Sequence, residues 1–230
     1  RVVELIILRD LKAGISTTTL NKIYDENFIY KTPYLGCQQF NSKKIKTILE
    51  RDGKIYSDIK NDGRYANTIV RPGHNIELVS RQGKNNSILG KFYEDLEFIK
   101  DKIGESFVLN GELMVRGYDR LSGNAIVSRC VSINQNIDNN EIKKADISKK
   151  KLLIEFGETF EVLQNKIYKV VWDIIPYDKY IKRLDETPRE ERLENLKTFF
   201  EKVKEFDIDS LVMQEYEIIE VENFNQEIST

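Results

Sequence analysis

The sequence feature that most constrains the fold is a nearly continuous apolar run at Ile167–Ile175. Such a run predicts a strand that is buried on both faces of a sheet, so helices or further strands have to cover it. Elsewhere apolar residues recur at helical spacing, and the clearest case predicts a helix over about 91–103, ended by Gly104, from Phe92, Leu96, Ile99 and Ile103. Strand and helix patterns therefore alternate from Lys54 onward, and we expect an α+β fold.

Further elements follow from the same periodicities. Alternating or apolar segments predict strands at 54–60, 64–71, 75–81, 107–115 and 211–213. Helical spacing and capping residues predict helices at 2–12, 18–24, 151–164 and 188–205, and the first turns of another at 222–230. Residues 118–150 are polar, and we expect a long insertion or a mobile loop there.

Composition and charge exclude several classes of protein. Hydrophobic residues make up 40% and charged residues 32% of the chain, as in a soluble globular protein. The formal net charge of −2 argues against a uniformly basic nucleic-acid binder. Two cysteines far apart in sequence and a single histidine, in a turn at His74, make neither a disulfide framework nor a zinc site. With no apolar run near the ~20 residues that span a membrane, we expect a reducing, cytoplasmic location and no membrane partner.

The stretch from Ile55 to Ala66 carries the strongest chemical signal. Polar and apolar residues alternate up to Lys60, Asp62-Gly63 is a turn signal, and an extended pattern resumes afterwards. We therefore expect a β-hairpin with Lys60 at its mouth. A lysine attacks only after it loses its proton, which a partly desolvated, cation-rich pocket favours, so Lys60 is a candidate nucleophile. The alternative is a solvated hairpin that carries these charges without a function.

Four stretches, in order, resemble the nucleotidyltransferase motifs of ATP-dependent DNA ligases, most closely the phage type. Lys60–Gly63 (KNDG) resembles motif I, and Ser80–Gly83 (SRQG) resembles motif Ia. Asn110–Leu113 (NGEL) is similar to motif III, and Val171–Asp173 (VWD) is similar to motif IIIa. Each motif is weak by itself, whereas the ordered and sensibly spaced set is specific.

The resemblance implies a covalent nucleotidyltransferase. In the family the motif I lysine, here Lys60, becomes linked to AMP. The arginine of motif Ia acts at the nucleotide and the nicked strand, the glutamate of motif III holds the ribose or a metal ion, and the aromatic residue of motif IIIa stacks on adenine. We therefore expect ATP and Mg²⁺ as cofactors, nicked double-stranded DNA as partner, and a monomer. The nucleotide-binding residues so implied are Ile59, Asp62, Gly63, Arg64, Tyr65, Arg81, Glu112 and Trp172, with Glu112 also at the metal.

Side-chain chemistry agrees with these roles and leaves alternatives open. Trp172 offers a rigid face, and stacking on a base is worth ~1–3 kcal/mol, although a lone tryptophan in an apolar strand is more often part of a core. Glu112 is an acceptor that suits a ribose hydroxyl or Mg²⁺, and Arg81 can bind a phosphate through two hydrogen bonds. Both also fit ordinary charged residues on the surface of a strand.

Two departures from the family pattern concern the site. Motif I commonly has arginine two places after its glycine, where this chain has Tyr65, and Arg64 comes one place earlier, on the opposite face of a strand. Either a local bulge brings Arg64 into the site in place of the motif I arginine, or Tyr65 has a role different from that of the arginine. In motif III, Asn110 stands where aspartate is usual, and we assign no role to it.

The resemblance also divides the chain into domains. Residues 9–16 are similar to the end of the helical DNA-binding domain of these ligases. We therefore expect residues 1–30 to end an all-helical domain, and residues 31–230 to form an adenylation (nucleotidyltransferase) domain of antiparallel sheets with flanking helices. The last two motifs of the family and its OB-fold domain are missing from the sequence, which predicts a fragment of a longer ligase.

Two other functions stay open. RNA ligases and capping nucleotidyltransferases share the lysine motif, and residues 9–16 argue against them. The missing final lysines instead favour a non-catalytic fragment that binds nucleotide or DNA. Transfer of AMP to nicked DNA or nicked RNA separates the first two functions, and binding without a covalent product indicates the third.

Overall fold

The computed structural model of this chain describes residues 17–24, 41–84, 86 and 90–220. The chain divides into two compact units, Arg1–Thr32 and Pro33–Thr230. In the first unit the structure describes helix α2 (Thr17–Ile23), which confirms the helix predicted over 18–24. The predicted helices at 2–12 and 222–230, and the ligase-like residues 9–16, lie outside the described residues. None of the described helices is long and apolar enough to cross a membrane.

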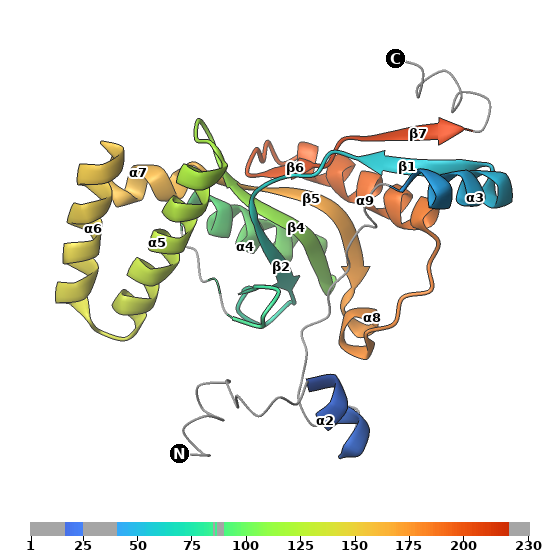
Figure 1. The fold of residues 1–230 in the computed structure, drawn as a ribbon. Helices are drawn as coiled ribbons and strands as arrows, with labels where there is room; N and C mark the ends of the chain where they lie inside the picture. Colours follow the sequence, from blue (N-terminus) through green and yellow to red (C-terminus); the bar gives the residue numbers. More distant parts are fainter. Residues whose placement is uncertain (1–16, 25–40, 85, 87–89, 221–230) are drawn as a thin grey trace. The chain divides into compact units, whose positions relative to one another are not determined.

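The second unit contains a five-stranded sheet and a separate two-stranded sheet (Figure 1). The larger sheet has the order β3-β2-β4-β5-β6 and is antiparallel except for the parallel pair β5–β6. Its strands are β2 (Arg64–Val70), β3 (Glu77–Val79), β4 (Phe107–Val115), β5 (Ile167–Pro176) and β6 (Leu211–Met213). The smaller sheet pairs β1 (Lys54–Asp58) with β7 (Tyr216–Glu220) in antiparallel fashion.

Helices flank both sheets, so the predicted α+β fold class is confirmed. Apolar residues of five of them form one core with the face of the larger sheet that carries Ala66, Leu109 and Val171. These five helices are α4 (Lys91–Ile103), α5 (Arg120–Asp138), α6 (Ile142–Phe156), α7 (Phe160–Asn165) and α9 (Arg189–Lys204). The other described helices of this unit are α3 (Ser42–Asp52) and α8 (Tyr177–Lys182). The opposite face of the sheet has a smaller apolar cluster and carries the polar residues discussed below.

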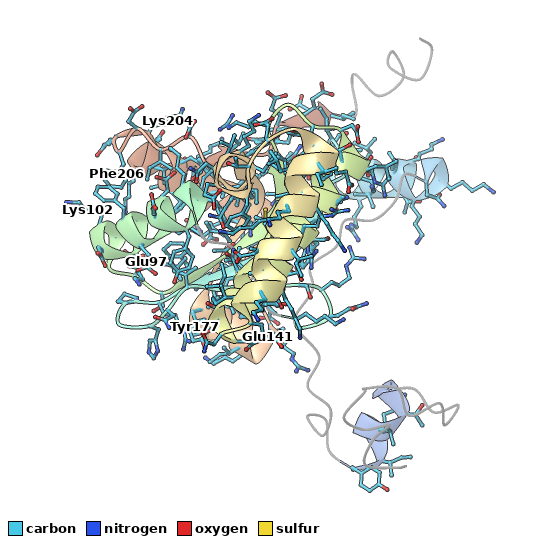
Figure 2. All side chains as sticks on the ribbon, turned by 90° about the vertical axis from the view of Figure 1, so that its left-hand side faces the viewer. Glu97, Lys102, Glu141, Tyr177, Lys204 and Phe206 are labelled. Atoms are coloured by element: carbon cyan, nitrogen blue, oxygen red, sulfur yellow. The ribbon has the colours of Figure 1, made fainter. Side chains whose placement is uncertain are left out.

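The far end of α4 packs against the segment that follows α9. The rings of Phe98 and Phe206 meet edge to face with centroids 5.4 Å apart. Figure 2 shows Phe206 beside Lys102 of α4 and Lys204 of α9. The end of α4 and the segment after α9 are therefore joined by an aromatic contact that the helical spacing predicted for α4 does not include.

Of the two alternatives predicted for residues 118–150, the mobile loop is wrong. This region forms α5 and most of α6, two helices that pack against each other and lie toward one side of the sheet (Figure 1). Four residues of α5 at helical spacing are fully buried, namely Ile126, Val127, Cys130 and Ile133. The apolar residues are few, but their helical spacing places them on one face that packs on the core, and most of the polar residues face solvent. The helix predicted at 151–164 is also divided, because Gly157 adopts φ +73° and ends α6 before α7 begins.

The predicted hairpin around Lys60 is wrong as well. β1 pairs with β7, whereas β2 pairs with β3 and β4, so residues 59–63 connect two different sheets. In register, Lys54 lies opposite Glu220, far along the chain. The Asp62-Gly63 signal indicates a change of direction, but local sequence carries no information on which distant strand pairs with β1.

Candidate active site

Lys60 lies in the connection between the two sheets. Its side chain is 82% exposed, and Nζ donates a hydrogen bond to Asp62 Oδ1 over 2.5 Å. This exposure differs from the partly desolvated pocket expected for the nucleophile. The hydrogen bond from Lys60 lowers the pKa of the Asp62 carboxyl. The amine is therefore aligned by Asp62 and open to an incoming substrate.

The backbone beyond Lys60 is fixed against β4. The Gly63 amide donates to Glu112 Oε2 at 2.6 Å. A Cβ on Gly63 would lie 2.5 Å from Leu113 O and 2.9 Å from Met114 Cγ, so this close approach requires glycine. The strand β4 thus holds the end of the lysine-bearing connection.

Two further elements hold the same connection. Asn61 Nδ2 donates to Gln214 Oε1, between β6 and β7. At the start of α5, Arg120 lies 3.3 Å from Asp62 Oδ1, and Asn124 Nδ2 donates to Asp62 O at 3.4 Å. The residues on both sides of Lys60 are therefore tied to the folded core.

Glu112 stands directly opposite Tyr65 in the β2–β4 ladder, so both side chains lie on the same face of the sheet. The carboxylate is half-buried, and this burial raises its pKa, although the hydrogen bond from Gly63 and the charges of Lys60 and Arg81 oppose the shift. Glu112, Lys60 and Arg81 are therefore electrostatic neighbours.

Trp172 occupies a bulge in β5. In the β4–β5 ladder Asn110 pairs with Asp173 and Gly111 pairs with Val171, which leaves Trp172 without a partner in β4. A bulge of this kind redirects a side chain without ending the sheet. The ring of Trp172 lies 6.1 Å from that of Tyr65.

Arg81 completes an aromatic and cationic cluster. Its guanidinium lies 5.5 Å from the centroid of the Tyr65 ring. The structure therefore brings together Tyr65, Trp172 and Arg81, which come from three separate segments of the chain. A planar ring pair beside a guanidinium suits a base and a phosphate.

The two departures from the family pattern meet at this cluster. Asn110 Nδ2 donates to the Tyr65 hydroxyl at 2.8 Å and to Asn67 Oδ1 at 2.7 Å, and all three side chains are buried. The motif pattern alone gives Asn110 no role, yet in the structure Asn110 holds the Tyr65 hydroxyl in place. The sequence signal for this contact is the pair of departures from the family pattern. Tyr65 replaces an expected arginine and Asn110 replaces an expected aspartate, so both charges of a possible buried ion pair are absent together, as suits two residues in contact.

The structure does not bring two of the predicted residues into this cluster. Arg64 lies on the other face, where it donates to Ser128 Oγ at 2.6 Å and to Asn86 Oδ1 at 2.7 Å. The β2–β4 register runs without a shift, so no bulge restores Arg64 to the site. Ile59 is 67% exposed.

The site offers carboxylate ligands for a metal ion but not a complete set of protein ligands. Among the described residues, no three His, Cys, Asp or Glu side chains are grouped to hold a metal. Mg²⁺ is usually held by only one or two carboxylates together with substrate phosphates, so Glu112 and the neighbouring Asp62 fit as its protein ligands.

Comparisons with known proteins bear on this arrangement. The chain matches the ATP dependent DNA ligase domain family over residues 37–229. Two solved proteins, Pmar-Lig_PreS3 and Pmar-Lig_Pre., match 98% of this chain with a TM-score of 0.61, at 19% and 18% identity. The ATP-dependent DNA ligase from bacteriophage T7, solved in complex with ATP, matches 86% of the chain with a TM-score of 0.57 at 18% identity. No curated protein sequence matches the chain.

The structural likeness shows that the chain has the fold of these proteins. The chain spans 45% of the length of each of the first two proteins and 59% of the length of the third. Because the family match covers most of the sequence, the chain belongs to the ATP-dependent DNA ligase domain family. The resemblance inferred from the four ordered motifs is confirmed.

Proposed function

We propose that this chain transfers AMP from ATP onto Lys60 as the first step of ATP-dependent DNA ligation. The observation that carries the proposal is the position of Lys60. Its exposed amine lies on a connection tied to Glu112 through Gly63, and Glu112 is in turn a neighbour of the cluster of Tyr65, Trp172 and Arg81. Family membership supports the reaction class, and the T7 relative was solved in complex with ATP, which supports the nucleotide.

The covalent step balances with the groups at hand. The neutral amine of Lys60 forms a bond to the α-phosphorus of ATP, and the bond from that phosphorus to the bridging oxygen breaks. The electron pair leaves with pyrophosphate. Because the pKa of Asp62 is lowered, its carboxylate is a weak base, so the proton of the ammonium group passes to solvent, to which Lys60 is open.

The other residues bind and orient the nucleotide. Trp172 supplies the surface for adenine with the buried Tyr65 ring beside it, Arg81 pairs with phosphate, and Glu112 accepts from the ribose or holds Mg²⁺. Bound Mg²⁺ would neutralise charge on the phosphates. Ile59 and Arg64 remain predictions from the motif alone.

The later steps of ligation, the domain division and the cellular role are also proposed. AMP would pass from Lys60 to the 5′-phosphate at a nick in duplex DNA, and the 3′-hydroxyl would then displace it. Residues 1–30 would end a helical DNA-binding domain, and residues 31–230 would form the adenylation domain. We further propose a cytoplasmic monomer that acts in DNA replication, repair and recombination.

The choice of polynucleotide can be tested directly. The chain is first loaded with AMP and freed of ATP, and is then offered nicked duplex DNA or nicked duplex RNA of equal sequence. We expect AMP to appear on the 5′-phosphate of the DNA nick, measured by gel electrophoresis. Transfer only to RNA would favour an RNA ligase, and nucleotide binding without any covalent AMP would favour a binding fragment.

Trp172→Ala should weaken ATP binding by about 5- to 150-fold, because stacking on a base is worth ~1–3 kcal/mol. Calorimetric titration with ATP and Mg²⁺ measures the affinity, and Trp172→Phe, which keeps an aromatic face, is the matched control. A loss of thermal stability in Trp172→Ala without a loss of affinity would instead assign Trp172 to the core.

A further inference from the structure

The strand that leads to Lys60 is joined to the larger sheet at the start of α9. β1 ends at Asp58, two residues before Lys60, and belongs to the smaller sheet. Arg189, the first residue of α9, lies between this strand and β5. It donates from Nη1 to Trp172 O at 2.8 Å, and its Nη2 lies 3.5 Å from Asp58 Oδ2.

The backbone carbonyl of Trp172 lies at a position of β5 that pairs with neither adjacent strand. On one side the bulge leaves Trp172 unpaired with β4, and on the other the pairing with β6 ends at Val171. A buried backbone carbonyl outside a ladder needs another donor. Arg189 supplies it, so the guanidinium stabilises the bulge that directs the Trp172 ring.

The contact with Asp58 is shielded from solvent. The side chains of Arg189 and Asp58 are 24% and 18% exposed, and Asp58 Oδ1 is buried with no hydrogen-bond partner among the described residues. Charges in such a setting interact more strongly than on the surface, and a carboxylate left without its cation would be costly. Arg189 therefore ties down the end of β1.

We propose that Arg189 is a positioning residue that sets the spacing between the nucleophile Lys60 and the ring of Trp172. A planar guanidinium with several donors can hold a strand end and a backbone carbonyl in one fixed geometry. This role rests on the proposed function, in which adenine lies on Trp172 while Lys60 attacks the α-phosphorus. Loss of the spacing should slow the attack more than it weakens nucleotide binding.

The first test separates binding from chemistry. Trp172 is the one tryptophan of the chain, so its fluorescence reports ATP binding, while mass spectrometry follows AMP on Lys60 in a single turnover. For Arg189→Met we expect the AMP-transfer rate constant to fall by about 10- to 100-fold, the cost of a displacement of about 1 Å, with ATP affinity little changed. Arg189→Lys should recover part of the rate.

A matched control removes the other ion pair between β1 and α9. Lys54 Nζ lies 2.8 Å from Glu190 Oε1, in an exposed position and away from the Trp172 carbonyl. Glu190→Gln should leave the transfer rate unchanged. Asp58→Asn should slow transfer, and its effect should not add fully to that of Arg189→Met, because both changes break the contact between Asp58 and Arg189.

The outcomes are distinct. A wild-type rate in Arg189→Met, an equal loss of rate and affinity, or the same loss in Glu190→Gln would overturn the role of Arg189. If Arg189→Met does not fold, wild-type rates in both Arg189→Lys and Asp58→Asn would overturn it. A wild-type chain that forms no AMP adduct would overturn the proposed function itself, and with it this role.

Discussion

Lys60→Met should abolish covalent AMP, with a loss of at least roughly 10⁴-fold in the rate of transfer, as expected when the only nucleophile of a covalent mechanism is removed. The fold should remain intact, because the Lys60 side chain is 82% exposed and its hydrogen bond is made to Asp62 within the same connection. The thermal midpoint should therefore match that of the wild type. Mass spectrometry after incubation with ATP and Mg²⁺ measures the adduct.

Lys102→Met provides the control for this substitution. Lys102 is an exposed lysine on α4, and its loss should leave both the adduct and the stability unchanged. A Lys60→Met protein that still carries AMP would show that another residue is the nucleophile. A Lys60→Met protein that unfolds would show that the connection has a structural role that its exposure does not indicate.

Gly111→Ala should destabilise the protein by about 3 kcal/mol, at the upper end of the usual cost of overpacking, because the added Cβ would meet rigid backbone. A Cβ at Gly111 would lie 2.1 Å from Val170 O and 3.0 Å from Lys169 Cε, so β4 and β5 would have to separate between Glu112 and Trp172. In a domain of this size the thermal midpoint should fall by about 6–12 °C. Thermal unfolding followed by circular dichroism measures the shift.

Gly123→Ala is the matched control for Gly111→Ala. Gly123 is buried within α5, where a Cβ would meet Val115 only at an ordinary 3.8 Å. Alanine in the interior of a helix is favoured over glycine by roughly 0.5–1 kcal/mol, so this change should raise the midpoint. A stable Gly111→Ala protein would contradict the close approach of β4 and β5.

Periodicity was sufficient to predict the elements whose apolar residues are numerous. The run at 167–175 is β5, and the spacing of Phe92, Leu96 and Ile99 is the buried side of α4. α5 and α6 were missed because few apolar residues cover their core, although those few are correctly spaced. The pairing of β1 with β7 was beyond local patterns, because the partner strand lies at the other end of the chain.

Lys169 and Asp173, two polar residues in the apolar run at 167–175, have buried contacts that the sequence pattern does not predict. Lys169 is fully buried and donates to Ala66 O and Thr68 Oγ1 of β2 and to Leu109 O of β4, and burial lowers the pKa of its amine. Asp173 is fully buried as well and lies 3.4 Å from Arg192. Their partners come from β2, β4 and α9, so the sequence could indicate burial but not the contacts that make it tolerable.

The site was predictable to the extent that it is local. The motifs group Lys60, Asp62 and Gly63, and in the structure Lys60 donates to Asp62 while Gly63 donates to Glu112. The roles assigned to these residues stay predictions. The contacts of Asn110 depend on the register of β2 against β4, and those of Arg189 depend on a bulge and on the junction of two sheets; none of these has a local sequence signal.

The measurement that tests the central claim most directly is the intact mass of this chain before and after incubation with ATP and Mg²⁺, followed by peptide mapping of any adduct. Our account predicts one AMP, located on Lys60 and absent from Lys60→Met. An adduct on another lysine, or no adduct on the wild-type chain, would contradict it.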